Sequence, residues 1–237
     1  MKSKCHFYCY MNTRKSNNFK TTRQDEIKLV VFDMDGVIID TISSWKYIHD
    51  YFHTSNDHSV DDYLKGKIDD LEFIRRDILL WKENGKLITR DKLAEIVKDV
   101  PLMKGSKECI ESLKEHNIKT AIVSAGLDVL ADIAKDELDI DYVFCNGAKT
   151  DEDGYLTGEG ILQVQLMYKD KNIFDLSKKL GIPLECIASI GNSCYDIPMF
   201  EVSGLGIAFN PDDDCVREAA DHIVEEKDLT KILPILF

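Results

Sequence analysis

An α/β fold is predicted, in which a doubly wound parallel sheet forms the core and a second, all-helical domain is inserted after the first strand. Three features of the 237 residues predict it. Short runs rich in Val and Ile alternate with helical patterns, as parallel strands and crossover helices do. One long stretch, 41–104, has helical patterns alone. Polar side chains follow several of the apolar runs, and ligands of doubly wound sheets bind beyond the carboxyl ends of the strands.

Six segments are predicted as strands because they are short, apolar and end in Gly, Asn, Asp or Glu. They are KLVVFD (28–33), KTAIVSAG (119–126), DYVFCNG (141–147), CIASIGN (186–192), LGIAFN (205–210) and DHIVEE (221–226). A further segment, DEDGYLTGEG (151–160), contains an Asp-Gly turn signal and predicts a β-hairpin excursion.

Helices are predicted between these strands where apolar residues recur at spacings of three and four. The segments are KECIESLKEH (107–116), LDVLADIAKDEL (127–138) and KNIFDLSKKL (171–180). The last is followed by Gly181, which is typical of a helix C-cap. Residues 27–40 and 105–237 therefore form the predicted core.

The insertion, residues 41–104, is predicted to be helical from three apolar stripes. They are Ile42, Trp45, Ile48 and Phe52, then Leu71, Ile74, Ile78 and Trp81, then Leu93, Ile96, Val97 and Val100. Because the insertion begins so soon after the first strand, we expect it to lie over the end of the sheet as a lid that excludes water. Its return hinge is predicted at PLMKG (101–105).

Charge and composition restrict the partners. The chain has 43 Asp and Glu against 30 Lys and Arg, whereas nucleic acids and anionic membranes call for clustered basic residues. It has no apolar run long enough for a membrane span and no apolar signal-peptide region. We expect a cytoplasmic protein whose partner is a small molecule, with seven reduced cysteines. Residues 1–26 are polar and predicted to be a disordered tail.

Two carboxylates, Asp33 and Asp35, directly follow the buried strand that ends at Phe32. Paired carboxylates could cap a helix, bind calcium, or act as a nucleophile with a proton-transfer partner. A calcium loop needs oxygen ligands at several closely spaced positions, which DMDGVIID does not supply. A carboxylate nucleophile with a second acid favours phosphoryl transfer through an aspartyl-phosphate.

The order of four motifs resembles the haloacid dehalogenase superfamily, most closely its phosphoserine-phosphatase-like branch. The motifs are FDMDGV, VSAG, a lysine before a helix, and IGNSCYDIPMF. The resemblance extends from Ile27 to the C-terminus and implies a Rossmann-like core with a helical cap in the first of the family's two cap positions.

The resemblance also implies roles for individual residues. Asp33 would be the nucleophile and Asp35 the general acid and base. Ser124 would bind phosphate with backbone N–H groups near Ala125 and Gly126. The cofactor would be Mg²⁺, with Asp33, the Asp35 carbonyl group, Asn192 and Asp196 as candidate ligands. Ser124 could instead be a helix N-cap.

Two lysines, Lys169 and Lys171, could be the phosphate-neutralising residue of the third motif. Ile173, Leu176 and Leu180 follow Lys169 at spacings of four, seven and eleven, so Lys169 shares their helical face. We therefore predict that Lys169 lies in the site and that Lys171 is a surface charge.

The fourth motif departs from the family pattern because Asn192 stands where an aspartate is usual. An amide oxygen is a weaker ligand for a hard cation than a carboxylate. Asp196 could coordinate the metal, bind a metal-bound water or orient Lys169. The alternative is a site without metal that senses phosphate ligands.

Substrate specificity is expected in the insertion. Arg75 or Arg76 could bind a substrate carboxylate, and Trp45, Lys46 and His49 are within plausible reach; Asn146 could line the site. The predicted function is magnesium-dependent hydrolysis of a small phosphorylated metabolite, with phosphoserine the leading candidate. A phosphotransferase to a hydroxyl acceptor is the alternative enzyme. The sequence does not indicate an oligomeric state.

Overall fold

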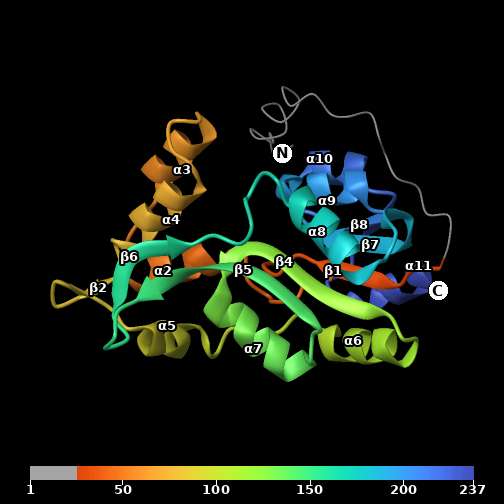
Figure 1. Cartoon of the computed structure of the whole chain (residues 1–237), viewed down its shortest axis with the longest axis horizontal. Coiled ribbons are helices and arrows are strands. Elements are labelled where there is room, and N and C mark those ends of the chain that lie inside the picture. Colours follow the sequence, from red (N-terminus) through yellow and green to blue (C-terminus); the bar gives the residue numbers. More distant parts are fainter. Residues whose placement is uncertain (1–25) are drawn as a thin grey trace.

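The structure is a computed structural model that describes residues 26–237 (Figure 1). Except for Glu26, the predicted disordered tail lies outside the described residues. Within them, no helix is both long and apolar enough to cross a membrane.

A seven-stranded sheet forms the centre of the fold and confirms the predicted architecture. Its order is β6-β5-β4-β1-β7-β8-β9, and only β6 runs antiparallel to its neighbour. Every predicted strand is present, and the 151–160 excursion is the β5–β6 hairpin. The bounds are β1 (Leu29–Phe32), β4 (Lys119–Leu127), β5 (Tyr142–Thr150), β6 (Leu156–Ile161), β7 (Ile187–Gly191), β8 (Leu205–Phe209) and β9 (His222–Val224).

Strand β1 lies at the centre of the sheet and is buried on both faces. Leu29 and Val31 pack into one hydrophobic core, and Val30 and Phe32 into the other. A strand covered on both faces needs an uninterrupted apolar run, which explains the sequence LVVF. Each such fully buried side chain stabilises the fold by roughly 1.5–3 kcal/mol.

Helices cover both faces of the sheet. Figure 1 shows α6 and α7 on one side and α8, α9 and α10 on the other. Helix α8 ends at Gly181, whose φ of 65° is the left-handed C-cap conformation predicted. The bounds are α6 (Ser106–Glu115), α7 (Asp128–Leu138), α8 (Asp170–Leu180), α9 (Ile197–Val202), α10 (Asp214–Ala219) and α11 (Leu233–Leu236), with short 3-10 helices at η1 (Leu184–Cys186), η2 (Cys194–Asp196) and η3 (Leu229–Ile232).

The inserted segment contains four helices and, unlike the all-helical expectation, a short hairpin. The elements are α2 (Ser44–Tyr51), α3 (Asp57–Leu64), α4 (Asp70–Ile78), the hairpin strands β2 (Lys82–Glu83) and β3 (Lys86–Leu87), and α5 (Arg90–Val97). The hairpin turns at Asn84 and Gly85, both with positive φ, which is the preferred pair for a tight turn. The first apolar stripe was wrong at Ile42, which precedes α2 and is 84% exposed.

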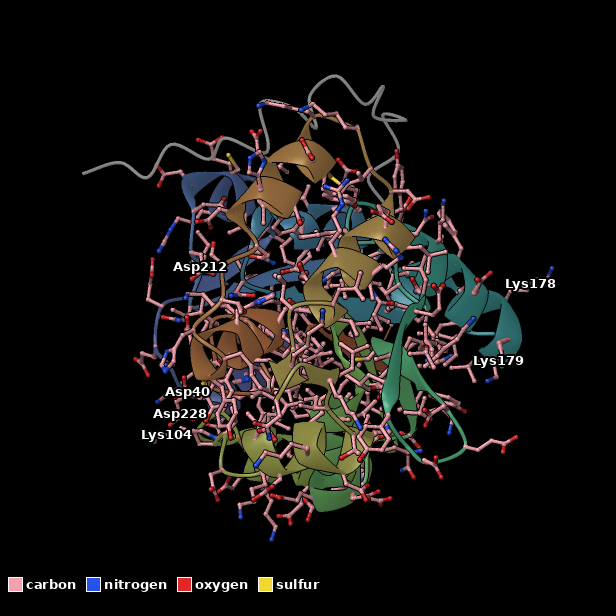
Figure 2. All side chains as sticks on the ribbon, turned by 90° about the vertical axis from the view of Figure 1, so that its left-hand side faces the viewer. Asp40, Lys104, Lys178, Lys179, Asp212 and Asp228 are labelled. Carbon is pink, nitrogen blue, oxygen red and sulfur yellow. The ribbon has the colours of Figure 1, made fainter. Side chains whose placement is uncertain are left out.

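The two ends of the insertion leave the core side by side. The Met103 N–H donates to the Ile38 carbonyl group, and the Asp40 N–H donates to the carbonyl group of Pro101. Lys104 forms a 2.9 Å ion pair with Asp228, and Figure 2 shows Asp40, Lys104 and Asp228 together at this edge of the molecule. The insertion also contacts β6, where Gly160 leaves room for Ile74 of α4, whose Cγ2 atom lies only 2.6 Å from where a β-carbon would be.

Candidate active site

Asp33 and Asp35 lie just beyond the carboxyl end of β1. The Asp33 N–H donates to the Ile190 carbonyl group of β7, so the backbone stays in the sheet as far as this residue. Met34 between them is fully buried in the hydrophobic core. Gly36 then turns the chain with a φ of 79°, a conformation that favours glycine. This turn presents both carboxylates at the end of the sheet.

Lys169 is the buried cation of the site. Its Nζ atom lies 2.9 Å from Asp33 Oδ1 and donates a 2.7 Å hydrogen bond to Asp196 Oδ1, and its side chain is 2% exposed. Lys171 is exposed, donates to Gln165 and lies over the Tyr168 ring. The structure therefore brings Lys169, and not Lys171, to Asp33 and Asp196, as we expected from the helical face on which Lys169 lies.

Asp196 holds the fourth motif together. Its Oδ2 atom accepts hydrogen bonds from the N–H groups of Asn192 and Ser193, both at 3.0 Å, and from the Ser193 hydroxyl group. Its other oxygen accepts from Lys169. Of the roles left open by the sequence, these contacts favour orientation of Lys169.

Ser124 lies in β4 near its carboxyl end, not at a helix N-cap. Helix α7 begins at Asp128, and the Ser124 hydroxyl group accepts a 3.2 Å bond from the Gly126 N–H. The β4–β5 register shifts between Ser124 and Leu127, so the backbone of Ala125 and Gly126 leaves the regular ladder. Gly126 also permits close packing, since a β-carbon there would lie 2.6 Å from Met34.

Ser44, which the sequence analysis did not select, anchors Asp35. Its N–H and hydroxyl groups both donate to Asp35 Oδ2 at 2.8 Å, and its hydroxyl oxygen accepts from the Leu127 N–H. Ser44 is fully buried at the start of α2. It therefore links the first motif, the second motif and the insertion. A serine at a helix start carries no sequence signal for this long-range role.

Burial, neighbouring charges and hydrogen bonds all shift the pKa values of these groups. Burial raises the pKa of Asp33, the Asp196 carboxylate raises it further, and Lys169 lowers it. Burial also raises the pKa of Asp35, while hydrogen bonds from Ser44 lower it. Burial would lower the pKa of Lys169, but Asp196 and Asp33 outweigh this effect and raise it. The lysine is therefore protonated between carboxylates that outnumber it.

The donor atoms around Asp33 fit a hard divalent cation. Asp35 Oδ1 is buried without a hydrogen-bond partner, and the buried Asp33 Oδ1 atom contacts Lys169 Nζ at 2.9 Å without a regular hydrogen bond. Among residues 26–237, no three His, Cys, Asp or Glu side chains form a metal-binding group, so a cation site here must use amide or backbone oxygens as well. Mg²⁺ is bound through one or two carboxylates with further oxygen ligands, and the residues present fit that pattern.

Asp212 adds a carboxylate beside Asn192 that the sequence analysis missed. The Asn192 Nδ2 group donates to Asp212 Oδ2 at 2.9 Å, and the Asp212 N–H donates to the Asn192 carbonyl group. The amide nitrogen is thereby used, which leaves the amide oxygen of Asn192 for a cation. Burial is the main cause that raises the pKa of Asp212. A carboxylate twenty residues away thus borders the amide that replaces the usual acid.

The predicted substrate residues have different outcomes. Trp45 lines the pocket, and its indole N–H donates to the Ala125 carbonyl group at 2.9 Å. Asn146 also lines it, but its side chain binds the backbone of Gln163 and Val164. The expectation for Arg75 and Arg76 was wrong, because neither lines the pocket. Both lie on the outer side of α4, where they pair with Glu72, and Arg76 also with Asp62.

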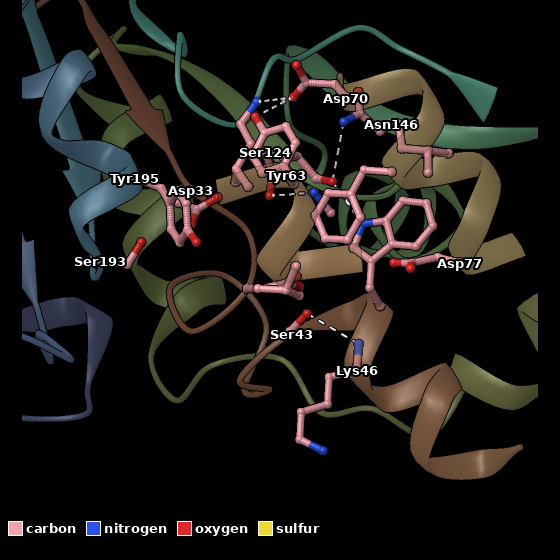
Figure 3. Close-up of a pocket in the computed structure, with 18 of the residues that line it drawn as sticks. Asp33, Ser43, Lys46, Tyr63, Asp70, Asp77, Ser124, Asn146, Ser193 and Tyr195 are labelled. Carbon is pink, nitrogen blue, oxygen red and sulfur yellow. Dashed lines mark hydrogen bonds between the residues drawn. The ribbon is translucent and has the colours of Figure 1, made fainter. Parts of the chain in front are cut away.

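A pocket of about 600 Å³ joins these groups to the insertion. Its floor contains Asp33, Asp35, Ser124, Lys169 and Asn192, and the insertion supplies most of the opposite wall. Figure 3 shows Asp33, Ser193 and Tyr195 on one side of the pocket and Asp77 on the other. The arrangement brings two carboxylates, Asp33 and Asp35, and the buried Lys169 cation to one pocket.

Comparisons with known proteins agree with this geometry. A family model described as haloacid dehalogenase-like hydrolase matches residues 27–204. A phosphoserine phosphatase of Archaeoglobus fulgidus is 30% identical over 223 residues, which are 91% of this chain and 62% of that protein. One of Methanocaldococcus jannaschii is 29% identical over 212 residues, covering 87% of this chain and 96% of that one. The chain therefore spans less than two thirds of the Archaeoglobus protein and nearly all of the Methanocaldococcus protein.

Solved structures show the same likeness. A substrate-bound phosphoserine phosphatase complex superposes with a TM-score of 0.75 at 26% identity, covering 90% of this chain and all of that chain. A phospho-aspartyl intermediate analogue of phosphoserine phosphatase gives the same values.

Proposed function

Because this chain belongs to the haloacid dehalogenase-like hydrolases, in their phosphoserine phosphatase-like branch, we propose that it is a magnesium-dependent phosphomonoesterase acting on a small phosphorylated metabolite. The observation that carries the proposal is the buried Lys169 ammonium group between Asp33 and Asp196, on the floor of a pocket that Asp35 and Ser124 also line. The names of the relatives make phosphoserine the first compound to test.

Asp33 and Asp35 have different roles in the proposed reaction. Asp33 attacks phosphorus, so that a bond forms between its oxygen and phosphorus while the bond to the leaving oxygen breaks. Asp35 gives its proton to that leaving oxygen and then takes one from the water that hydrolyses the aspartyl-phosphate. The raised pKa of Asp35 favours a protonated acid. Its Oδ2 already accepts two bonds from Ser44, so Oδ1 is the atom free to carry the proton.

Two groups hold the phosphate. The Ser124 hydroxyl group accepts from Gly126, which leaves its own hydrogen to donate to a phosphate oxygen. Lys169 contributes positive charge next to the nucleophile, where the phosphoryl group must approach. The insertion covers this position and limits the access of water.

Asp33, the Asp35 carbonyl group and the Asn192 amide oxygen would hold Mg²⁺, with Asp212 adding negative charge behind the amide. A bound Mg²⁺ supplies charge that reduces repulsion between phosphate and carboxylate and stabilises the phosphoryl oxygens during transfer.

Removal of the Asp212 charge should weaken magnesium binding. We expect Asp212→Asn to raise the Mg²⁺ dissociation constant by about tenfold, a typical cost of losing a group behind a ligand. Calorimetric Mg²⁺ titration of the folded protein measures this without turnover. The double variant Asn192→Asp, Asp212→Asn exchanges the two groups and should restore binding. An unchanged affinity in Asp212→Asn would contradict the role of Asp212.

Loss of the Ser44 hydroxyl group should affect turnover more than binding. We expect Ser44→Ala to lower kcat by about tenfold to a hundredfold with little change in KM, because Asp35 loses a hydrogen bond that orients it. Thr89→Ala, which removes the N-cap bond of α5 in the same insertion, is the control for destabilisation. Equal effects of the two variants on kcat would rule out a positioning role for Ser44.

The proposed function is tested by phosphate release from a panel of phosphomonoesters, with magnesium and with a chelator. Magnesium-dependent release from a generic aryl phosphate supports the phosphatase. Product that forms only when a hydroxyl acceptor is added would favour a phosphotransferase. Binding of phosphate compounds by the folded protein without any release would favour a phosphate sensor.

A further inference from the structure

The wall of the pocket opposite the phosphate site combines carboxylates with aromatic rings. We infer that this wall selects a phosphomonoester whose alcohol carries a positively charged nitrogen and no carboxylate. The inference deepens the proposed phosphatase function and rests on it. We call this wall the distal wall; its residues are Trp45, Asn56, Tyr63, Asp70, Phe73 and Asp77.

Asp77 is the most unusual group of the distal wall. It is 3% exposed, and its Oδ2 atom accepts a 2.9 Å hydrogen bond from Asn56. Its Oδ1 atom is buried without a hydrogen-bond partner. The nearby His49 Nε2 atom lies 3.5 Å from Oδ2 and is not within hydrogen-bond geometry. A buried carboxylate oxygen without a partner is costly, and a cationic ligand would remove that cost.

Asp70 adds a second carboxylate to the same wall. It accepts 3.0 Å hydrogen bonds from the Tyr63 hydroxyl group and the Leu166 N–H, which fix its orientation at the pocket (Figure 3). The ring of Tyr63 stacks on Phe73 with centroids 5.1 Å apart, and the ring of Trp45 packs against Trp81 with centroids 5.4 Å apart and a tilt of 30°. Aromatic faces beside carboxylates are a recognised environment for ammonium and quaternary ammonium groups.

Basic groups that could bind a substrate carboxylate are scarce. In the part of the chain that the structure describes, Lys169 and Lys46 are the only Lys or Arg residues that line the pocket. Lys169 already forms ion pairs with Asp33 and Asp196. The Lys46 side chain is 60% exposed, pairs with Asp50 and extends away from Asp77 in Figure 3. A carboxylate-bearing substrate such as phosphoserine would therefore place a negative charge against Asp70 and Asp77.

The test compares kcat/KM for five compounds with the full chain and magnesium. They are 2-aminoethyl phosphate, its N-trimethyl derivative, phosphoserine, glycerol phosphate and an aryl phosphate. We expect at least one cationic compound to exceed both phosphoserine and glycerol phosphate by about tenfold or more. A preference for 2-aminoethyl phosphate would indicate that the carboxylates contribute most to binding of the cation. A preference for the trimethyl derivative would indicate that the aromatic rings contribute most. Either result supports the inference.

Variants locate the preference. We expect Asp77→Asn to lower kcat/KM for the cationic compound to about that for glycerol phosphate, chiefly through a higher KM. Asp70→Asn is a second variant at a less buried position, and we expect it also to lower the preference for the cationic compound. Asp61→Asn is the control, since Asp61 lies outside the pocket on α3 and pairs with Lys65. The substrate preference of Asp61→Asn should match that of the unsubstituted protein.

Two results would overturn the inference, and they differ. Hydrolysis of the aryl phosphate with phosphoserine or glycerol phosphate equal to or better than the cationic compounds would contradict the inference and leave the phosphatase standing. Release from none of the five compounds would contradict the proposed function together with the inference.

Discussion

Asp33→Asn should abolish turnover, with kcat lower by at least about 10⁴-fold, because an amide cannot act as the attacking oxygen. The substitution preserves shape, so the fold and the binding of phosphate compounds should remain. A phosphate-release assay measures the loss of turnover, and calorimetric titration of the same preparation with a phosphate compound measures binding.

The control for Asp33→Asn is Asp40→Asn. Asp40 lies in the same connection after β1, but it forms an ion pair with Lys227 outside the pocket. We expect its turnover to stay within about twofold, as for most surface substitutions. Turnover by Asp33→Asn similar to that of the control would assign the nucleophile elsewhere.

Lys169→Met should have the second largest effect, on both turnover and stability. We expect kcat to fall by about 10³-fold, since the substitution removes the preorganised positive charge beside the nucleophile. Without magnesium, the free energy of unfolding should fall by about 3 kcal/mol, because Asp33 and Asp196 lose the cation that they share while buried. Steady-state kinetics and urea unfolding give the two values.

Lys171→Met separates this effect from a general loss of charge on α8. The exposed ammonium group of Lys171 contacts Gln165 and the Tyr168 ring. We therefore expect Lys171→Met to change kcat by no more than about twofold and the free energy of unfolding by no more than about 0.5 kcal/mol. If Lys171→Met impaired turnover as strongly as Lys169→Met, the assignment of the two lysines would be reversed.

Periodicity was sufficient to predict features that depend on local sequence. The apolar run before Asp33 predicted a buried strand, and the spacing along 169–180 placed Lys169 on the same face as the inward-packing residues of α8. The first prediction depends on an uninterrupted apolar run and the second on the helical repeat, and a single sequence displays both directly. Gly181 predicted the end of α8 because glycine favours the left-handed conformation of a helix C-cap.

Contacts between distant segments were not predictable in this way. Ser44 binds Asp35 and Leu127, and Asp212 binds Asn192 across twenty residues. Neither Ser44 nor Asp212 lies in a recognisable sequence pattern. The choice of Arg75 and Arg76 failed because the sequence does not show which face of α4 meets the pocket. Ile74 and Asp77 face inward, so the two arginines between them point outward.

A covalent bond between Asp33 and phosphorus can be detected by acid quenching the protein during turnover of an aryl phosphate and mapping the phosphoryl group by mass spectrometry. We expect one phosphoryl group on the peptide that contains Asp33, and none on that peptide in Asp33→Asn. Phosphate release during turnover with no modification of Asp33, or with the phosphoryl group on another residue, would contradict this expectation.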